Sequence, residues 1–154
     1  MGAVKAYLKQ IRRLDNAINF LIRERDDLIV KRTGLRGISY NSDKVQTSPS
    51  GEDPNNRITE KIIDMTRKID EEIDEYTDIK KKIVAQIIAL NDARYSEILQ
   101  RRYVDYQPFD QIADEMFYTY DTIRHYHQDA LRMFGEKYAF DVKAFEKKMR
   151  KNTH

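Results

Sequence analysis

Cysteine and tryptophan are both absent from this chain of 154 residues. Because there is no cysteine, the sequence excludes a disulfide framework, a thiolate metal site and a cysteine nucleophile. Long apolar runs are absent as well. The first residues lack the apolar core of a signal peptide, and no segment is long enough to span a bilayer. We therefore expect a soluble protein of the cytoplasm.

The residue arrangements that carry catalysis are also missing. The sequence has no Gly-rich phosphate loop, no supported Ser–His–Asp order and no paired carboxylates fixed in a pocket. His125 and His127 stand two positions apart, and residues with this spacing on a helix point to opposite sides, so they cannot chelate one ion. We therefore expect no enzyme activity, no metal site and no cofactor.

Charged residues are abundant, at 35% of the chain against 40% for the hydrophobic set. This composition is too polar for a large globular core and suits long, partly exposed helices. The formal net charge of +2 conceals an uneven distribution. Residues 1–36 carry a balance of +5 and residues 139–154 a balance of +3, whereas residues 91–138 carry −3.

Two long helices are expected in the first 90 residues. Apolar residues recur at spacings of three and four over about residues 4–32 and 56–90, which predicts helices with one apolar stripe each. Gly34, which follows two basic residues, is typical of a helix end. The connector, placed at about residues 34–55, is rich in Ser, Asp and Pro and has no apolar period.

Neither long helix could bury its apolar stripe alone. Two antiparallel helices joined by a loop bury each other's stripes, so we expect a long, coiled-coil-like helical hairpin over residues 1–90. Both stripes also stay close to a heptad repeat, which leaves an intermolecular coiled coil open. A homodimer through the hairpin is compatible with either arrangement.

The residue pattern changes after residue 91, where the expected helices are shorter and aromatic residues are more frequent. We expect a module over residues 91–138 with helices at about 93–104, 109–116 and 120–134. Thr119 is a suitable N-cap for the third helix, since its hydroxyl can accept from the N–H of Thr122, and Gly135 is expected to end it. The expected core residues are Ile98, Leu99, Tyr103, Phe109, Ile112, Ala113, Met116, Ile123, Tyr126, Ala130, Leu131 and Phe134.

A family resemblance follows from this module. The run RYVDYQPFDQIADEMFYTYDTIRHYHQDALRMF resembles sigma factor region 4: Arg-Tyr ends one helix, Ile-Ala lies inside the second, a hydroxyl residue caps the third, and an Ile precedes Ala-Leu by two turns. The wider chain, including SDKVQTSPSGED in the loop, is similar to small phage- and prophage-encoded proteins that join such a module to an N-terminal helical hairpin. These look related to the RinA/ArpU-type regulators of phage late genes.

This resemblance implies a sequence-specific, DNA-binding transcriptional regulator in the cytoplasm of a bacterial host. Its partners would be double-stranded DNA and possible contacts with RNA polymerase, and its helix-turn-helix would place the helix 120–134 in the major groove. The implied base-reading residues are Thr119, Tyr120, Asp121, Thr122, Arg124, His125 and Gln128. The candidates for phosphate contact are Arg101, Arg102, Arg132, Lys143, Lys147 and Lys148.

Three of the implied base-reading residues have side chains that suit particular DNA groups. Arg124 could contact a guanine edge, Asp121 could accept from a cytosine amino group, and Tyr120 could touch phosphate or a thymine methyl. Phe117 stands in the turn at a position where glycine is common, and a positive φ there would cost about 1–2 kcal/mol. Phosphate neutralisation usually dominates the affinity of a protein for DNA. Because residues 91–138 carry a net charge of −3, the basic ends of the chain could compensate only if they also face the duplex.

Residues 139–154 are expected to form a basic C-terminal helix or tail. Phe145 and Met149 share one side of an amphipathic stretch over residues 142–151, and Asp141 is a suitable cap. The stretch could pack on the module, follow the DNA backbone or remain unattached.

Two other functions fit the same sequence. An acidic region 4-like module could bind RNA polymerase or a sigma factor with little DNA contact. A phage packaging component similar to a small terminase subunit also combines helix-turn-helix and coiled-coil parts.

Overall fold

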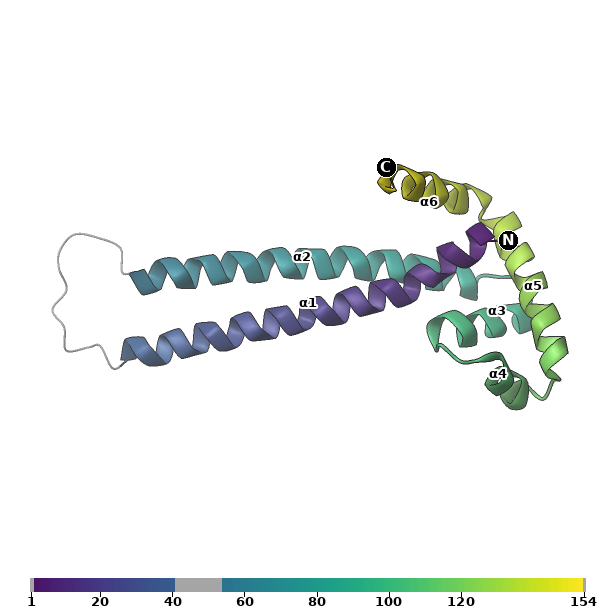
Figure 1. The fold of residues 1–154 in the computed structure, drawn as a ribbon, viewed down its shortest axis with the longest axis horizontal. Coiled ribbons are helices and arrows are strands. Elements are labelled where there is room, and N and C mark those ends of the chain that lie inside the picture. The colour runs from purple at the N-terminus through teal and green to yellow at the C-terminus, as the bar shows by residue number, and fades with distance from the viewer. Residues whose placement is uncertain (1, 41–53, 154) are drawn as a thin grey trace. The chain divides into compact units, whose positions relative to one another are not determined.

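The computed structural model describes residues 2–40 and 54–153, with side chains described in all of these except residues 35–40. Every regular element in the described residues is a helix, which confirms the expected all-α class. No helix among them combines the length and hydropathy needed to cross a bilayer. The elements in chain order are α1 (Gly2–Tyr40), α2 (Pro54–Ile88), α3 (Ala93–Leu99), the π-helical turn η1 (Gln100–Val104), α4 (Phe109–Met116), α5 (Tyr120–Lys137) and α6 (Ala139–Asn152) (Figure 1).

The helices form two compact units, and α1 and α2 each contribute to both. One unit contains residues 1–15 and 78–154, and the other contains residues 16–77. This division differs from the segments expected from the sequence. The start of α1 and the end of α2 belong with the C-terminal helices rather than with the remainder of the two long helices.

In the unit of residues 16–77, α1 and α2 run antiparallel. A guanidinium nitrogen of Arg25 donates to Asp70 at 2.9 Å, and Ile29, further along α1, borders a cavity with Thr66, earlier in α2. The buried apolar side chains among the described residues of this unit are few: Leu21, Ile62 and Ile69. This unit therefore has a thin core, and the hairpin expected over residues 1–90, which spans both units, stays a prediction.

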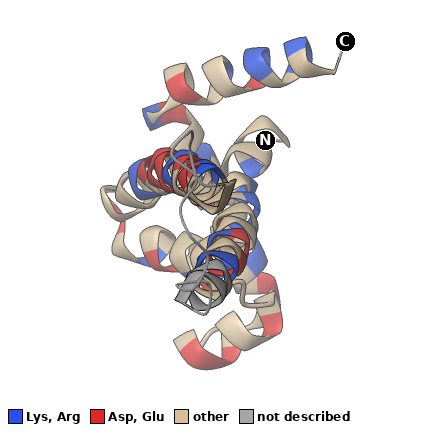
Figure 2. Cartoon of the chain, turned by 90° about the vertical axis from the view of Figure 1, so that its left-hand side faces the viewer, with Lys and Arg blue, Asp and Glu red and all other residues tan. Residues whose placement is uncertain are grey.

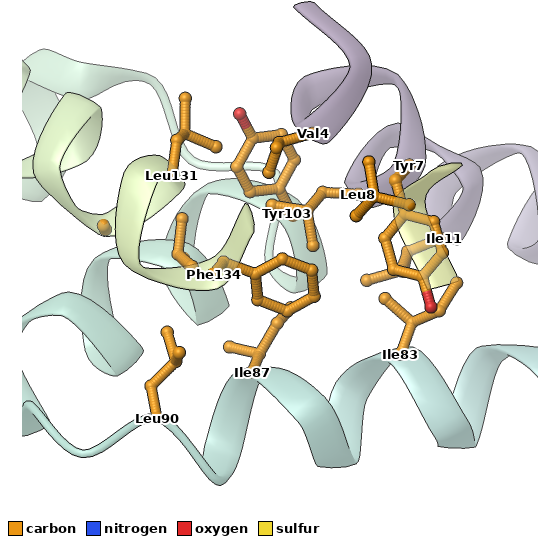
Figure 3. Packing of buried hydrophobic residues seen from close by; sticks show 13 residues of the cluster. Val4, Tyr7, Leu8, Ile11, Ile83, Ile87, Leu90, Tyr103, Leu131 and Phe134 are labelled. Atoms are coloured by element: carbon orange, nitrogen blue, oxygen red, sulfur yellow. The ribbon is translucent and has the colours of Figure 1, made fainter. Parts of the chain in front are cut away.

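The main hydrophobic core lies in the unit of residues 1–15 and 78–154 (Figure 3). Phe134 of α5 points toward Ile87 of α2, and Ile11 of α1 lies beside Ile83. These side chains are almost completely buried, and each contributes about 1.5–3 kcal/mol of transfer free energy. The remaining members of the cluster come from the same helices, from the residues just after α2, and from α3, η1 and α6: Val4, Tyr7, Leu8, Leu90, Leu99, Tyr103, Ala130, Leu131 and Val142.

A second, smaller core forms among α3, α4 and α5. Its buried members are Ile98, Ile112, Ala113 and Ile123, all of which were expected in the core from helical periodicity. The partly buried side chains around it are Phe109, Met116, Tyr118 and Tyr126. The α4 bounds, Phe109–Met116, agree with the expected helix at 109–116, and the cluster holds α3, α4 and α5 together.

Two glycines that were expected to end helices do not end them. The prediction at Gly34 was wrong, because α1 continues to Tyr40. The rest of the expected 34–55 connector, residues 41–53, lies outside the described residues. The prediction at Gly135 was also wrong: α5 continues to Lys137, and a Cβ on Gly135 would lie 2.8 Å from Cγ2 of Val4. Glycine at 135 therefore leaves room for Val4 of α1 and does not end the helix.

The structure also corrects two further expectations in this unit. Residues 93–104 were expected as one regular helix, whereas α3 ends at Leu99 and η1 continues as a π-helical turn. Asp141 was expected to cap the C-terminal helix, but the N-cap position of α6 is Tyr138. The Asp141 carboxylate instead accepts hydrogen bonds at 3.0 Å from the ammonium of Lys82 and the amide of Gln86.

Candidate nucleic-acid interface

The turn between α4 and α5 consists of residues 117–119. Phe117 is the C-cap of α4 and adopts the left-handed conformation, with φ 61° and ψ 39°. The backbone N–H of Tyr118 donates to the carbonyl of Ala113 at 3.0 Å, which closes the end of α4. The positive φ considered from the sequence is therefore present, and a bulky residue occupies it with its side chain 93% exposed.

Thr119 caps α5 as expected. Its hydroxyl accepts from the backbone N–H of Thr122 at 3.2 Å, and the two threonine hydroxyls lie 2.8 Å apart. This cap fixes where α5 begins, because it satisfies one of the amide donors that the first helical turn leaves without an intrahelical partner. The residues that follow are thereby held in a defined orientation relative to α4.

The predicted base-reading residues share the solvent-facing side of the first turns of α5. Thr122 is partly buried, and the remaining six are exposed: Thr119, Tyr120, Asp121, Arg124, His125 and Gln128. The ring of Tyr120 meets Phe109 of α4 edge-on, with the ring centroids 6.4 Å apart, and the Arg124 guanidinium lies 6.0 Å from the centroid of the Tyr120 ring. Two of the side chains are thus partly ordered by contacts within the protein, while their polar groups remain accessible.

The phosphate candidates on η1 are engaged inside the protein. Arg101 forms ion pairs with Glu97, at 3.0 Å, and with Glu115 of α4. Arg102 donates to the carbonyl of Gln107 at 3.1 Å, and its guanidinium lies 4.1 Å from the centroid of the Phe109 ring. Both arginines therefore hold η1 against the segment before α4, which sequence spacing alone did not indicate.

The other phosphate candidates project into solvent. Arg132 is exposed on α5 and pairs weakly with Asp129 at 3.4 Å. Lys143, Lys147 and Lys148 are exposed on α6, and Figure 2 shows blue Lys or Arg positions along the helix that carries the C-terminus. Of the alternatives for the C-terminal stretch, packing applies: Val142 is buried, and the ring of Phe145 meets Tyr7 edge-on at 5.8 Å. The lysines thus occupy the outer side of a docked helix.

His127 lies on the opposite side of α5 from the reading residues. It is 5% exposed, its Nε2 lies 2.8 Å from the Tyr103 hydroxyl, and the two rings are stacked. Burial lowers the pKa of His127 to about 4, with smaller contributions from the positive charges of Lys5 and Arg102. His127 is therefore a neutral core residue, whereas His125 is exposed, as their spacing predicts.

The compact unit that contains the reading residues has a different charge from the segment considered in the sequence. Residues 1–15 and 78–154 contain 18 Lys and Arg and 13 Asp and Glu, a net charge of +5. The unit of residues 16–77 contains 10 Lys and Arg and 13 Asp and Glu, a net charge of −3. Residues 1–15 and residues 139–154 each add +3 to the −3 of residues 91–138, and residues 78–90 add +2; the sequence analysis placed residues 1–15 and 78–90 in the hairpin instead.

Comparison with known proteins does not assign the chain to a family. No protein-family model, no curated protein and no solved structure matches it.

Proposed function

We propose that this protein is a sequence-specific, DNA-binding transcriptional regulator of phage or prophage type, which reads the major groove with the first turns of α5. The observation that carries this proposal is the exposed polar face of α5 immediately after a capped, three-residue turn from α4. A helix-turn-helix presents its second helix in this way, with N-terminal residues directed at base edges. Arg124 offers a guanidinium for guanine and Asp121 an acceptor for cytosine.

The charge of the surrounding unit supports the same proposal. A protein that neutralises several phosphates gains most of its non-specific affinity from that term. With a net charge of +5, the unit that carries α5 is attractive to DNA, although residues 91–138 alone carry −3. Exposed lysines on α6 and the basic residues at the start of α1 supply the excess.

Selection of bound sequences from a random duplex pool, followed by gel shifts with the purified chain, tests the proposal. Arg124→Ala and His125→Ala should each weaken binding to the selected site, and Arg124→Ala should relax preference at one base pair by about 1–3 kcal/mol. Glu136→Gln is the matched control, since Glu136 is exposed on the same helix three turns further on. Unchanged sequence-specific binding in both alanine variants would overturn the assignment of the reading face.

We also propose that the unit of residues 16–77 mediates homodimerisation. Its core is thin, and several large apolar side chains stay exposed on both helices, among them Phe20, Ile29, Ile63 and Met65. A second copy could cover these residues by forming a four-helix arrangement. Analytical ultracentrifugation should show a dimer that Ile63→Glu dissociates; a monomer at all concentrations would refute this part of the proposal.

A protein-interaction module is the second candidate, and two exposed aromatic residues favour it. Phe117 is 93% exposed and Phe140 is 84% exposed, and single large aromatic side chains often act as anchors at protein interfaces. RNA polymerase or a sigma factor would be the partner. Capture of polymerase by the wild-type chain, its loss in Phe117→Ser, and no DNA binding at low salt would together favour this candidate.

A further inference from the structure

A small cavity opens between the start of α1 and the end of η1. Its volume is about 130 Å³, and it is lined by Lys9, Arg12, Arg102, Tyr103 and Tyr106. Three of the five lining side chains are cations, and none is a carboxylate. All five belong to the same compact unit, although they come from segments about 90 residues apart in the sequence.

The two arginines of this cavity are positioned by contacts with neutral groups. The Arg12 guanidinium lies 5.1 Å from the centroid of the Tyr106 ring. Arg102 donates to the Gln107 carbonyl at 3.1 Å and lies over the Phe109 ring, so its orientation is fixed without a neutralising partner. Since cation–π contacts and carbonyl hydrogen bonds leave the positive charge in place, these arginines keep their attraction for an anion.

Acidic groups near the cavity are already engaged. Asp15 accepts from the Tyr106 hydroxyl and pairs with Lys80 of α2. Within the described residues, Lys9 and Arg12 have no carboxylate within ion-pair distance. The lowered pKa of His127, to which Lys5 and Arg102 contribute after burial, is consistent with a positive potential behind the cavity.

The backbone around the cavity is unusual in two independent ways. Arg102 and Tyr103 lie in the π-helical turn η1, and single π-helical turns inserted after an α-helix are frequent at functional sites. Tyr106 adopts a positive φ of 59°, a conformation that a bulky residue rarely takes without support from its surroundings. The π-turn directs Arg102 to the cavity and the left-handed residue brings Tyr106 under Arg12.

We propose that this cavity is a binding site for a phosphate group, held by Lys9, Arg12 and Arg102. Guanidinium forks and an ammonium group are the side chains that proteins commonly use for phosphate oxygens. The phosphate could belong to a DNA backbone or to a free phosphate compound. The site does not depend on the proposed reading face of α5, because it is built from other residues.

The first experiment titrates the full chain with inorganic phosphate, against sodium chloride of equal ionic strength, and follows two-dimensional NMR signals. The amides of η1 and the side-chain N–H of Arg102 should shift and saturate. Lys9→Gln and Arg12→Gln should each weaken the apparent affinity about tenfold, since one of three nearby charges is removed. Arg13→Gln is the matched control, because Arg13 is the exposed neighbour of Arg12 and lines a different cavity with Phe145 and Met149.

The second experiment identifies the source of the phosphate by measuring DNA affinity at several salt concentrations. If a backbone phosphate occupies the site, Arg12→Gln should reduce the slope of log affinity against log salt by about 1 relative to Arg13→Gln. An unchanged slope together with saturable phosphate binding assigns the site to a free phosphate compound. If the chain binds no DNA, the proposed function fails and the phosphate titration still decides this site.

The proposal is overturned if the NMR shifts caused by phosphate do not saturate and Arg12→Gln leaves the salt slope of DNA binding unchanged. It is also overturned if Arg13→Gln weakens phosphate binding as strongly as Arg12→Gln does. Lys9→Gln guards against a folding artefact, because Lys9 is exposed on α1 and its replacement leaves the contact between Arg12 and Tyr106 intact.

Discussion

Acid should destabilise this protein through His127 before most carboxylates titrate. In the folded chain the pKa of His127 is about 4, mainly because of burial, whereas an unfolded histidine has a pKa of about 6.5. Below the unfolded value the unfolded chain takes up a proton that the folded chain does not, so the free energy of unfolding falls as pH falls from about 6.5 to about 4. The full difference corresponds to about 3 kcal/mol, of which about 2 kcal/mol is lost between about pH 7.5 and pH 5.

The measurement compares urea unfolding at these two pH values, followed by far-ultraviolet circular dichroism, in the wild type and in His127→Gln. Glutamine is neutral throughout and its amide can hydrogen-bond with the Tyr103 hydroxyl, so the variant should lose about 2 kcal/mol less than the wild type over this interval. His125→Gln is the matched control, since His125 is exposed two positions earlier on the same helix, and it should lose as much as the wild type.

Direct titration provides an independent check on the same reasoning. The ring protons of His127 should keep their neutral chemical shift down to about pH 5 in the folded chain. The reasoning is refuted if His127 titrates near the unfolded value, or if wild type and His127→Gln lose equal stability. In that case the contact with Tyr103 would have to accommodate a charged ring.

Three further changes test individual features of the fold by urea unfolding. Gly135→Ala should raise stability by about 1 kcal/mol in a Val4→Ala background, where the added methyl has room. In the wild type the added methyl meets Val4, so the gain should be smaller or absent. Equal effects in both backgrounds would contradict the close approach of Val4 to Gly135. Phe117→Asn should stabilise the chain by about 1 kcal/mol by relieving the positive φ, whereas Phe117→Ala should not, and a gain from alanine alone would point to another cause. Asp92→Ala should cost about 1 kcal/mol because Asp92 accepts from two backbone N–H groups at the start of α3, and Asp92→Asn should retain most of that stability unless the cap is unimportant.

The parts of the fold that could be predicted are those determined by local sequence. Helix α4 was placed at its observed bounds because Pro108 stops continuation from one side and the apolar pattern ends at Met116. The Thr119 cap was predictable for the same reason, since a hydroxyl before an amphipathic run satisfies free amides of the next helix. Local signals were sufficient wherever the competing tertiary contacts were few.

Glycine was misleading because its two uses look alike in a sequence. A glycine after an apolar run can end a helix by adopting a positive φ, or it can sit within a helix where another backbone or side chain comes close. Gly135 is the second case, because Val4 lies against it from a helix more than 130 positions earlier. No local pattern carries information about such a distant neighbour.

The proposed reading face of α5 and the cavity differ in how far local sequence predicts them. Six of the seven residues proposed to read DNA are exposed, and this exposure follows from helical periodicity once the start of α5 is known. The cavity requires Arg12 and Arg102 to meet, and that depends on how α1 packs on the core, on a π-helical turn and on a left-handed Tyr106. None of these three features leaves a periodic signal in the sequence.

The charge that a ligand encounters is also a property of packing rather than of a sequence segment. At physiological ionic strength a fixed charge acts over about 8 Å, so only the side chains that folding brings near a site determine its potential. Residues 91–138 carry −3, yet the unit in which they fold carries +5, because the start of α1, the end of α2 and the C-terminal helix pack beside them. A fragment that begins at residue 91 would lose the cations of residues 1–15 and 78–90 and, with Val4, Leu8, Ile83 and Ile87, much of the core that covers Phe134. The same contacts therefore supply both the stability of the proposed DNA-binding module and the positive charge that it lacks by itself.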